Sequence, residues 1–289
     1  MAATPTTGFL LGKFLPPHRG HQYLIEFARA YVDRLTVLVC SIARESIPGD
    51  LRYRWMCESF PGIAFVHHTD EIPQAPEEHP QFWDIWRTSI RRHVPGPIDY
   101  VFASEGYGWR LAEELGARFV PVDIARRNVP VSGRAIRDDP MTHWEALLPA
   151  VRPYYLKRVC VLDDVRPSLA DALTAEFRTV CVHRYDGSRD SGSGRARSAA
   201  EAALSRQANR VLICEADAAT ATLLAEEPRF DLYLVPETNH IGAMLAARGL
   251  PLVRLHGPRE MQTAQAVAAI RGIIAPRRPA AAPDVGVAV

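Results

Sequence analysis

The sequence predicts an α/β protein built from doubly wound parallel β-sheets. Short apolar runs that suit buried strands alternate with longer segments whose apolar residues recur at helical spacing. The first run, 8–11, is followed by a helical segment at 21–31 and by a second apolar run at 35–42. Strands joined through helices form right-handed crossovers, and a series of these builds an open sheet with helices on both faces. The same alternation begins again after residue 158, which predicts a second α/β domain.

The remaining elements follow from the same two patterns. Apolar runs predict strands, in the order 63–67, 99–103, 118–122, 159–162, 179–183, 210–214, 231–235 and 251–255. Helical periodicity predicts helices at 50–60, 81–93, 109–115, 132–137, 141–148, 169–177, 198–206, 216–226, 239–248 and 258–274. Asp50 suits a helix start and Gly116 a helix end. The segment 70–80 is rich in proline and acidic residues, which predicts an exposed loop.

The composition is that of an ordinary globular protein. The 289 residues suit two medium domains, and 47% of them are hydrophobic. A net charge of +1 argues against binding nucleic acid through bulk electrostatic attraction. No apolar run approaches the roughly 18–20 residues that span a bilayer, and residues 1–7 lack the features of a signal peptide. We therefore expect a cytoplasmic protein with no membrane partner. Reduced thiols are expected for the five cysteines, Cys40, Cys57, Cys160, Cys181 and Cys214.

The segment 12–21, which reads Gly-Lys-Phe-Leu-Pro-Pro-His-Arg-Gly-His, joins the first strand to the first helix. The start of a helix has unpaired backbone N–H groups and the positive end of the helix dipole, so it suits phosphate. Gly12 and Gly20 allow close backbone approach, and His18 and His21 are three residues apart on one helix face. Two histidines could also suggest a metal site, but no third ligand stands at a suitable spacing. The segment therefore predicts a polyphosphate site and no metal held by the protein.

A second segment, 131–137, completes the pattern. The first segment matches G-x-F-x-P-x-H-x-G-H, and the second resembles I-S-[SG]-T-x-I-R, with Arg134 in place of the threonine. Together they resemble the NadR-type nicotinamide-mononucleotide adenylyltransferase and ribosylnicotinamide kinase family, over roughly residues 8–160. The resemblance implies a Rossmann-like nucleotidyltransferase domain at 1–150 and a kinase-like α/β domain at 151–274. Residues 275–289, with three prolines, are expected to be disordered.

The resemblance also implies a reaction and the residues that support it. AMP would pass from ATP to nicotinamide mononucleotide, giving NAD and pyrophosphate, with Mg²⁺ accompanying the ATP. The residues expected to stabilise the transferring phosphate are His18, His21, Lys13 and Arg137. Those expected to bind the nucleotide are Gly12, Phe14, Gly20, Ser132, Gly133 and Arg134. Those expected to bind the acceptor are Trp83, Trp86, Arg44, Ser104, Glu105 and Tyr107. One tryptophan would stack on the nicotinamide ring, although core packing also explains the pair. Arg52 and Arg54 are further candidates for a phosphate contact.

The second domain departs from the family pattern. A kinase of this type would carry a G-x-x-x-x-G-K-[ST] loop after the strand at 159–162. Residues 163–169 contain neither glycine nor lysine, and they begin with Asp163 and Asp164, which would repel phosphate. The glycine-rich run 187–194 is expected to be a flexible loop, and Asp217 resembles a kinase position. The sequence therefore predicts that the kinase activity is absent.

Two other functions remain open. A related transferase could use a different phosphate acceptor, such as phosphopantetheine or a sugar phosphate. Alternatively, a regulator could bind ATP or NAD without catalysing a reaction, although two intact histidines argue against this. No helix pair of the DNA-binding type precedes residue 8, so a DNA partner is not expected. The sequence leaves open whether nicotinamide or nicotinate mononucleotide is preferred and whether the chain forms a homo-oligomer.

Overall fold

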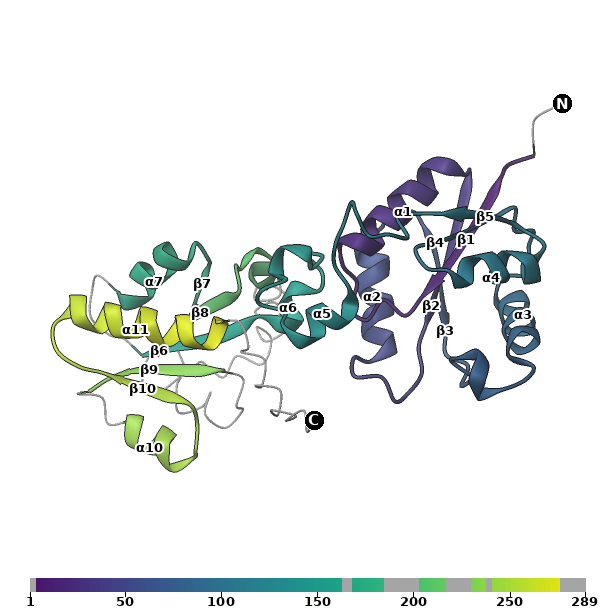
Figure 1. Ribbon diagram of the computed structural model, residues 1–289. Helices are drawn as coiled ribbons and strands as arrows, with labels where there is room; N and C mark the ends of the chain where they lie inside the picture. The colour runs from purple at the N-terminus through teal and green to yellow at the C-terminus, as the bar shows by residue number, and fades with distance from the viewer. Residues whose placement is uncertain (1–3, 163–167, 185–202, 217–229, 238–240, 276–289) are drawn as a thin grey trace, which may run out of the picture. The chain divides into compact units, whose positions relative to one another are not determined.

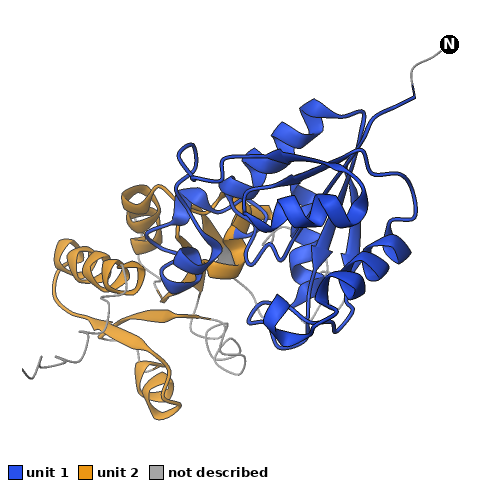
Figure 2. Cartoon of the chain, turned by 45° about the vertical axis from the view of Figure 1, so that its right-hand side comes forward, with its two compact units in different colours: residues 1–151 blue, residues 152–289 orange. Residues whose placement is uncertain are grey.

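The chain divides into two compact units, residues 1–151 and 152–289 (Figures 1 and 2). The computed structural model describes residues 4–162, 168–184, 203–216, 230–237 and 241–275. Each unit contains one five-stranded sheet in which every pair of neighbouring strands is parallel. The α/β class predicted from the alternation is therefore confirmed in both halves of the chain.

The first unit has the strand order β3-β2-β1-β4-β5. The strands are β1 (Thr7–Gly12), β2 (Arg34–Cys40), β3 (Ala64–His68), β4 (Tyr100–Ala103) and β5 (Arg118–Pro121). The chain winds outward from β1 to β3, then returns to place β4 on the other side of β1. This reversal makes the carboxyl end of β1 the switch point of the sheet, where α/β proteins bind their ligands.

Helices cover both faces of this sheet (Figure 1). These helices are α1 (Arg19–Tyr31), α2 (Gly49–Ser59), α3 (Phe82–His93) and α4 (Tyr107–Leu115). The unit also contains the short helix α5 (Gly133–Asp138) and 3₁₀ turns at Pro76–Glu78 and Trp144–Ala146. On one face, buried residues of α3 and α4, such as Ile90 and Leu111, pack against Phe9, Leu38 and Val101 of the strands. This packing fixes the strand ends around which the cleft forms.

The second unit has the strand order β10-β9-β6-β8-β7. The strands are β6 (Lys157–Leu162), β7 (Cys181–Arg184), β8 (Val211–Ala216), β9 (Leu232–Pro236) and β10 (Leu252–Leu255). Its helices within the described residues include α6 (Arg152–Tyr155), α7 (Leu169–Phe177), α10 (Ile241–Ala247) and α11 (Arg259–Ile274). Leu173 of α7 and Ile270 of α11 pack on one face of the sheet with Val159 and Ile213, and α10 covers the other face (Figure 1).

One predicted helix is wrong. The segment 141–148 forms only the short 3₁₀ turn Trp144–Ala146. Leu147 is extended and pairs with His18 in an isolated antiparallel bridge, which a continuing helix would prevent. The helix predicted to start at 109 begins two residues earlier, at Tyr107. The helix is therefore shorter than predicted, and the bridge connects Leu147, near the end of the first unit, to His18.

Several predictions concern residues outside those that the structure describes. They include most of the 163–169 segment, the glycine-rich run 187–194, Asp217, the helix at 216–226 and nearly all of the tail. No disulfide joins the five cysteines, all of which are described. Within the described ranges, every helix is too short or too polar to cross a bilayer.

Candidate active site

A cleft of about 850 Å³ opens in the first unit beside the carboxyl end of β1. It is bordered by fifteen of the sixteen residues that the sequence singled out: Gly12, Lys13, Phe14, His18, Gly20, His21, Trp83, Trp86, Ser104, Glu105, Tyr107, Ser132, Gly133, Arg134 and Arg137. Arg44 does not border it. The Arg44 side chain is 71% exposed and lies 3.7 Å from the Glu78 carboxylate. The two motif segments therefore face one space although they are more than a hundred residues apart in the sequence.

His18 and His21 cap the first helix reciprocally. His18 precedes α1, and its Nδ1 accepts the backbone N–H of Gly20 at 3.0 Å. His21 Nδ1 accepts the backbone N–H of His18 at 3.2 Å. The ring centroids are 3.8 Å apart, and a Cβ on Gly20 would approach the His18 ring to 2.9 Å. Two backbone donors at the helix start are thus satisfied by imidazoles, an arrangement more often made by serine and glutamate.

This capping determines where each ring carries its proton. A neutral imidazole has one N–H and one acceptor nitrogen, and in both rings Nδ1 is the acceptor. The proton of each neutral ring is therefore on Nε2. Burial, helped by the positive charge of Arg126, lowers the pKa of His18 to about 4. Burial, then His18 and Arg126, lowers the pKa of His21 well below its usual value. At neutral pH the cleft thus contains two uncharged Nε2–H donors.

Arg126 is a cleft residue that the sequence analysis missed. Its side chain lies 3.2 Å from the Glu105 carboxylate, and its charge reaches both histidines. The turn that presents it has left-handed backbone at Asp123 (φ 47°) and at Arg126 (φ 51°). The Asp123 carboxylate accepts backbone N–H groups from 127–129, which holds the turn in place. Neither motif includes this turn, and its conformation has no periodic pattern in the sequence.

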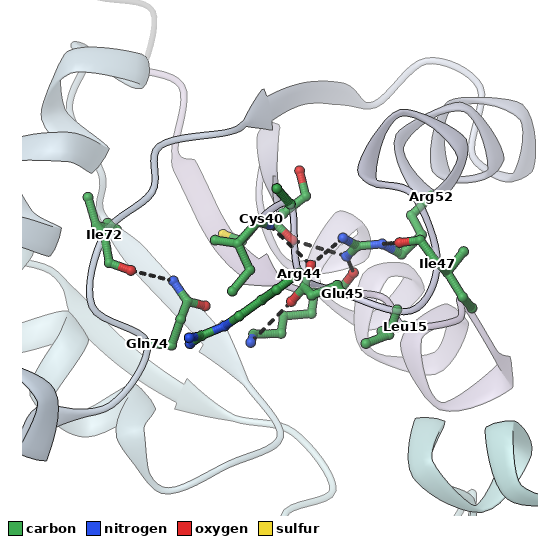
Figure 3. Close-up of polar contacts among 12 residues, drawn as sticks. Leu15, Cys40, Arg44, Glu45, Ile47, Arg52, Ile72 and Gln74 are labelled. Carbon is green, nitrogen blue, oxygen red and sulfur yellow. Dashed lines mark hydrogen bonds and ion pairs between the residues drawn. The ribbon is translucent and has the colours of Figure 1, made fainter.

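The backbone of the first motif is held by a buried cation (Figure 3). Arg52 of α2 is fully buried and donates hydrogen bonds to the backbone carbonyls of Lys13, Cys40 and Ile47. It also donates to the carboxylate of Glu45, which lies 3.1 Å from the Lys13 ammonium. Arg52 therefore joins the ends of β1 and β2, and its donors are used on these internal acceptors rather than on the phosphate contact for which it is a candidate. Arg54, another candidate, is exposed and pairs with Asp50.

The second motif packs directly on the first. Ser132 caps α5 by accepting the backbone N–H of Ala135 at 3.1 Å. Arg137 donates a hydrogen bond to the carbonyl of Leu15. A Cβ on Gly133 would lie 2.5 Å from the same carbonyl oxygen, so only glycine allows this approach. Arg134, which replaces the threonine of the motif, is exposed at the cleft and lies 3.8 Å from Asp138.

Aromatic and polar residues outside the two motifs also border the cleft. Trp86 is buried, and its indole N–H donates to the carbonyl of Pro73 at 2.8 Å. Trp83 is half-buried and meets Phe82 edge-on. The Tyr107 hydroxyl donates to the carbonyl of Leu11 at 3.2 Å. Trp86 therefore packs in the core and also borders the cleft, and stacking of either tryptophan on a nicotinamide ring stays a prediction.

Potential metal ligands gather at a different place. Among the described residues, His68, Asp70 and His93 place one ligand atom each within 4.8 Å of one another. Their polar atoms already share hydrogen bonds with Ser89 and Arg92, so we assign no metal to them. Inside the cleft, the charged groups are the cations Lys13, Arg126, Arg134 and Arg137 and the carboxylates Glu105 and Asp123. This excess of positive charge, together with the two imidazole donors, suits an anionic phosphate ligand.

Comparison with known proteins identifies similar chains. No family model matches the sequence. The trifunctional NAD biosynthesis/regulator protein NadR of Escherichia coli (strain K12) is 26% identical over 200 residues, which cover 62% of this chain and 48% of that protein. Its counterpart from Salmonella typhimurium is 26% identical over 198 residues, with the same coverage. The chain thus spans about half the length of the curated relatives it matches.

Solved structures extend the likeness to the whole fold. A crystal structure of NadR protein in complex with NAD and AMP-PNP has a TM-score of 0.70 at 17% identity, covering 96% of this chain and 99% of that one. A NadR structure in complex with NR has a TM-score of 0.67 at 18% identity, covering 96% and 98%. Both units of this chain therefore share their fold with these proteins.

Proposed function

Since the chain resembles the NadR-type proteins in sequence and in fold, we propose that its first unit is a nicotinamide-nucleotide adenylyltransferase. It would transfer AMP from ATP to nicotinamide mononucleotide and release NAD and pyrophosphate. The observation that carries the proposal is the meeting of the two motifs at one cleft, where Arg137 of the second donates to Leu15 of the first. The relatives' names support a role in NAD biosynthesis, and one similar structure contains NAD and AMP-PNP.

The reaction needs positive charge more than it needs a base. An oxygen of the acceptor 5′-phosphate forms a bond to the α-phosphorus of ATP, and the bond from that phosphorus to the bridging oxygen breaks as pyrophosphate leaves. With a second pKa of about 6, the attacking phosphate is mostly dianionic at neutral pH, so no group has to remove a proton. The enzyme's task is to bring two anions together and to stabilise the charge on the oxygens of the α-phosphate and the leaving group.

The cleft residues divide this task. His18 and His21 would donate their Nε2–H groups to phosphate oxygens, beside the positive end of α1. Lys13 would leave Glu45 to contact the triphosphate, while Arg137 would bind phosphate with the donors that Leu15 does not use. Arg126 would add a cation close to both imidazoles. Ser132 and Gly133 bring the start of α5 to the same space.

Mg²⁺ would enter with ATP. The carboxylates at the cleft are Glu105, which pairs with Arg126, and Asp123, which holds a turn. Neither is arranged with other acidic groups to hold an ion tightly. Mg²⁺ keeps several waters and often binds through substrate phosphates, so the donors of the cleft fit an ion carried in by the nucleotide. When bound, it would neutralise the charge of the triphosphate.

The aromatic residues that border the cleft would bind the base of the acceptor. Trp83, Trp86 and Gln74 border the same cleft as the second motif. A positively charged nicotinamide ring over an indole gains a cation–π contribution of roughly 0.5–2 kcal/mol. This favours nicotinamide mononucleotide over phosphopantetheine or a sugar phosphate, which have no aromatic ring. Ser104 and Glu105 would contact the ribose or the base.

A regulatory function is the second candidate. The curated relatives are described as trifunctional biosynthesis and regulator proteins, so the chain could also sense ATP or NAD. For the second unit we propose that kinase activity is absent, because residues 163–169 lack the glycine and lysine of a phosphate loop. Phosphorylation of nicotinamide riboside by the purified chain would refute that part of the proposal.

The deciding experiment measures pyrophosphate release from ATP and Mg²⁺ with a panel of acceptors. The panel contains nicotinamide mononucleotide, nicotinate mononucleotide, phosphopantetheine and a sugar phosphate. We expect release with a pyridine mononucleotide and formation of the matching dinucleotide. Release with another acceptor alone would replace the proposed substrate. Tight binding of ATP or NAD without any release would favour the sensor.

A further inference from the structure

A buried histidine that neither motif includes, His68, packs against Trp86, one of the aromatic residues that border the cleft. The His68 ring is stacked on the Trp86 indole, with ring centroids 5.5 Å apart and planes inclined by 18°. His68 is only 1% exposed. The indole N–H of Trp86 donates a hydrogen bond to the backbone carbonyl of Pro73. Trp86 also borders the cleft. The tryptophan that stacks on His68 is therefore itself a cleft residue.

A chain of hydrogen bonds fixes the His68 ring. Its Nε2 is 2.7 Å from the hydroxyl oxygen of Ser89, and that hydroxyl donates to the Asp70 carboxylate. A hydroxyl has a single proton, which here is used on Asp70, so the His68 nitrogen must be the donor. Asp70 also accepts from Arg92. Hydrogen bonding from Ser89 lowers the pKa of Asp70, which keeps it a carboxylate at neutral pH.

The charges around His68 oppose one another. Asp70, 3.3 Å away, favours the protonated ring, while burial, His93 and Arg92 favour the neutral ring. The His93 ring centroid is 5.0 Å from that of His68. The balance lowers the pKa of His68, with burial as the main cause. His68 is thus neutral at neutral pH and gains its charge only below its usual pKa of 6.5, in contact with a tryptophan that borders the cleft.

We propose that His68, Ser89 and Asp70 position the Trp86 ring, and that a cationic aromatic base binds in the cleft more tightly while His68 is neutral. A proton on His68 would place a positive charge against one face of the indole. The ring would then attract a second cation less, because cation–π attraction depends on the electron density of the ring face. The identity of this base as a pyridinium rests on the proposed function, whereas the coupling of His68 to Trp86 does not.

The first test needs no substrate. Tryptophan fluorescence would be followed from pH 8 to pH 4.5, because a protonated imidazole in contact with an indole quenches its emission. We expect a quench in the wild-type chain with a midpoint below 6.5. His68→Phe, which keeps an aromatic ring behind Trp86, should lose it. His67→Phe is the matched control, because His67 precedes His68 on β3 but has other partners. Its ring stacks on Tyr53 and forms a hydrogen bond with Ser41. An unchanged quench in His68→Phe, or no quench in the wild type, would overturn the coupling.

The second test uses the acceptor. From pH 7.5 to pH 5.5 the KM for nicotinamide mononucleotide should rise in the wild type by about two- to fivefold, the size of an exposed cation–π contribution. The KM for ATP should change equally in wild type and variant. Protonation of the acceptor phosphate, with its second pKa of about 6, contributes to the rise in the acceptor KM in every variant. His68→Phe should therefore remove only the part that depends on His68 and leave a smaller rise than in the wild type, and Ser89→Ala should shift the midpoint of the His68-dependent part. A chain without turnover would refute the proposed function but leave the fluorescence result standing. Stoichiometric Zn²⁺ binding that requires both His68 and His93 would instead make this cluster a metal centre and overturn the inference.

Discussion

Arg137 donates a hydrogen bond to the backbone carbonyl of Leu15, across 122 positions of the sequence. The contact joins α5 to the loop before α1, and it requires Gly133 to approach the same carbonyl. The two motifs are therefore one structural unit rather than two separate ligand contacts.

This relationship predicts the effect of adding one methyl group. Gly133→Ala would place a Cβ 2.5 Å from the Leu15 oxygen, so α5 must shift and Arg137 must move with it. We expect a loss of about 1–3 kcal/mol in the free energy of unfolding, typical of overpacking, measured by denaturant titration. Adenylyl transfer should fall by a larger factor than stability alone explains. Gly96→Ala is the control, because a Cβ there meets nothing within 4 Å; equal effects of the two changes would contradict the account.

Arg52 should be essential to stability and not to ligand contact. It is fully buried and bonded to three backbone carbonyls and Glu45. Arg52→Ala would leave three backbone carbonyls without this donor and the Glu45 carboxylate with Lys13 as its remaining cation, at a cost of about 3–5 kcal/mol in unfolding free energy. The double variant Arg52→Ala/Glu45→Ala should lose less than the sum of the single variants in thermal or denaturant melts. Additive losses would show that the pair is not coupled.

His18 should affect turnover more than binding. His18→Ala removes both the Nε2–H donor and the cap of α1, whereas His18→Asn leaves a short polar side chain that can still cap. We expect kcat to fall by about 10²-fold or more in both variants, as when one donor to a developing negative charge is lost. ATP affinity, measured by calorimetry, should change by much less. If kcat and affinity fell by the same factor, His18 would act in binding alone.

Acid should destabilise the first unit. The pKa of His18 falls from 6.5 to about 4 on folding, so the unfolded chain binds more protons between these values. Stability is then greatest above pH 6.5 and decreases as the pH falls toward 4, by on the order of 3 kcal/mol for this group. Protonation also takes away the Nδ1 acceptor that caps α1. Urea melts from pH 7.5 to pH 4 should show the decrease, and His18→Asn should reduce it.

Arg126 should be visible in the titration of both histidines. Its charge helps to lower their pKa values, although burial contributes more. In Arg126→Gln the pKa of His18 should rise, as followed by NMR of the imidazole nitrogens, while the fold is retained because Arg126 is 45% exposed on its side chain. ATP binding should weaken at the same time. Unchanged histidine titration would place the Arg126 charge away from the rings in solution.

Much of this site follows from the sequence because its motifs are contiguous. The strand, loop and helix start at 7–21 are local, and their glycines and histidines lie where the pattern predicts. Arg126 cannot be predicted in this way, because its position depends on left-handed backbone in a turn that has no periodic pattern of residues in the sequence. Arg52 is one of several arginines that the sequence offers as candidates for a phosphate contact, and its burial arises only when β1, β2 and α2 come together. His68 behind Trp86 is likewise a product of tertiary packing.

The reciprocal cap of α1 bears on how this signature is inherited. Each imidazole stabilises the start of a helix as well as facing the cleft, so natural selection for folding alone would preserve the pair. A descendant that had ceased to make its product would still display an intact histidine signature. Only a measured conversion of substrate therefore distinguishes an active enzyme from an inactive homologue, because both would carry the same two histidines.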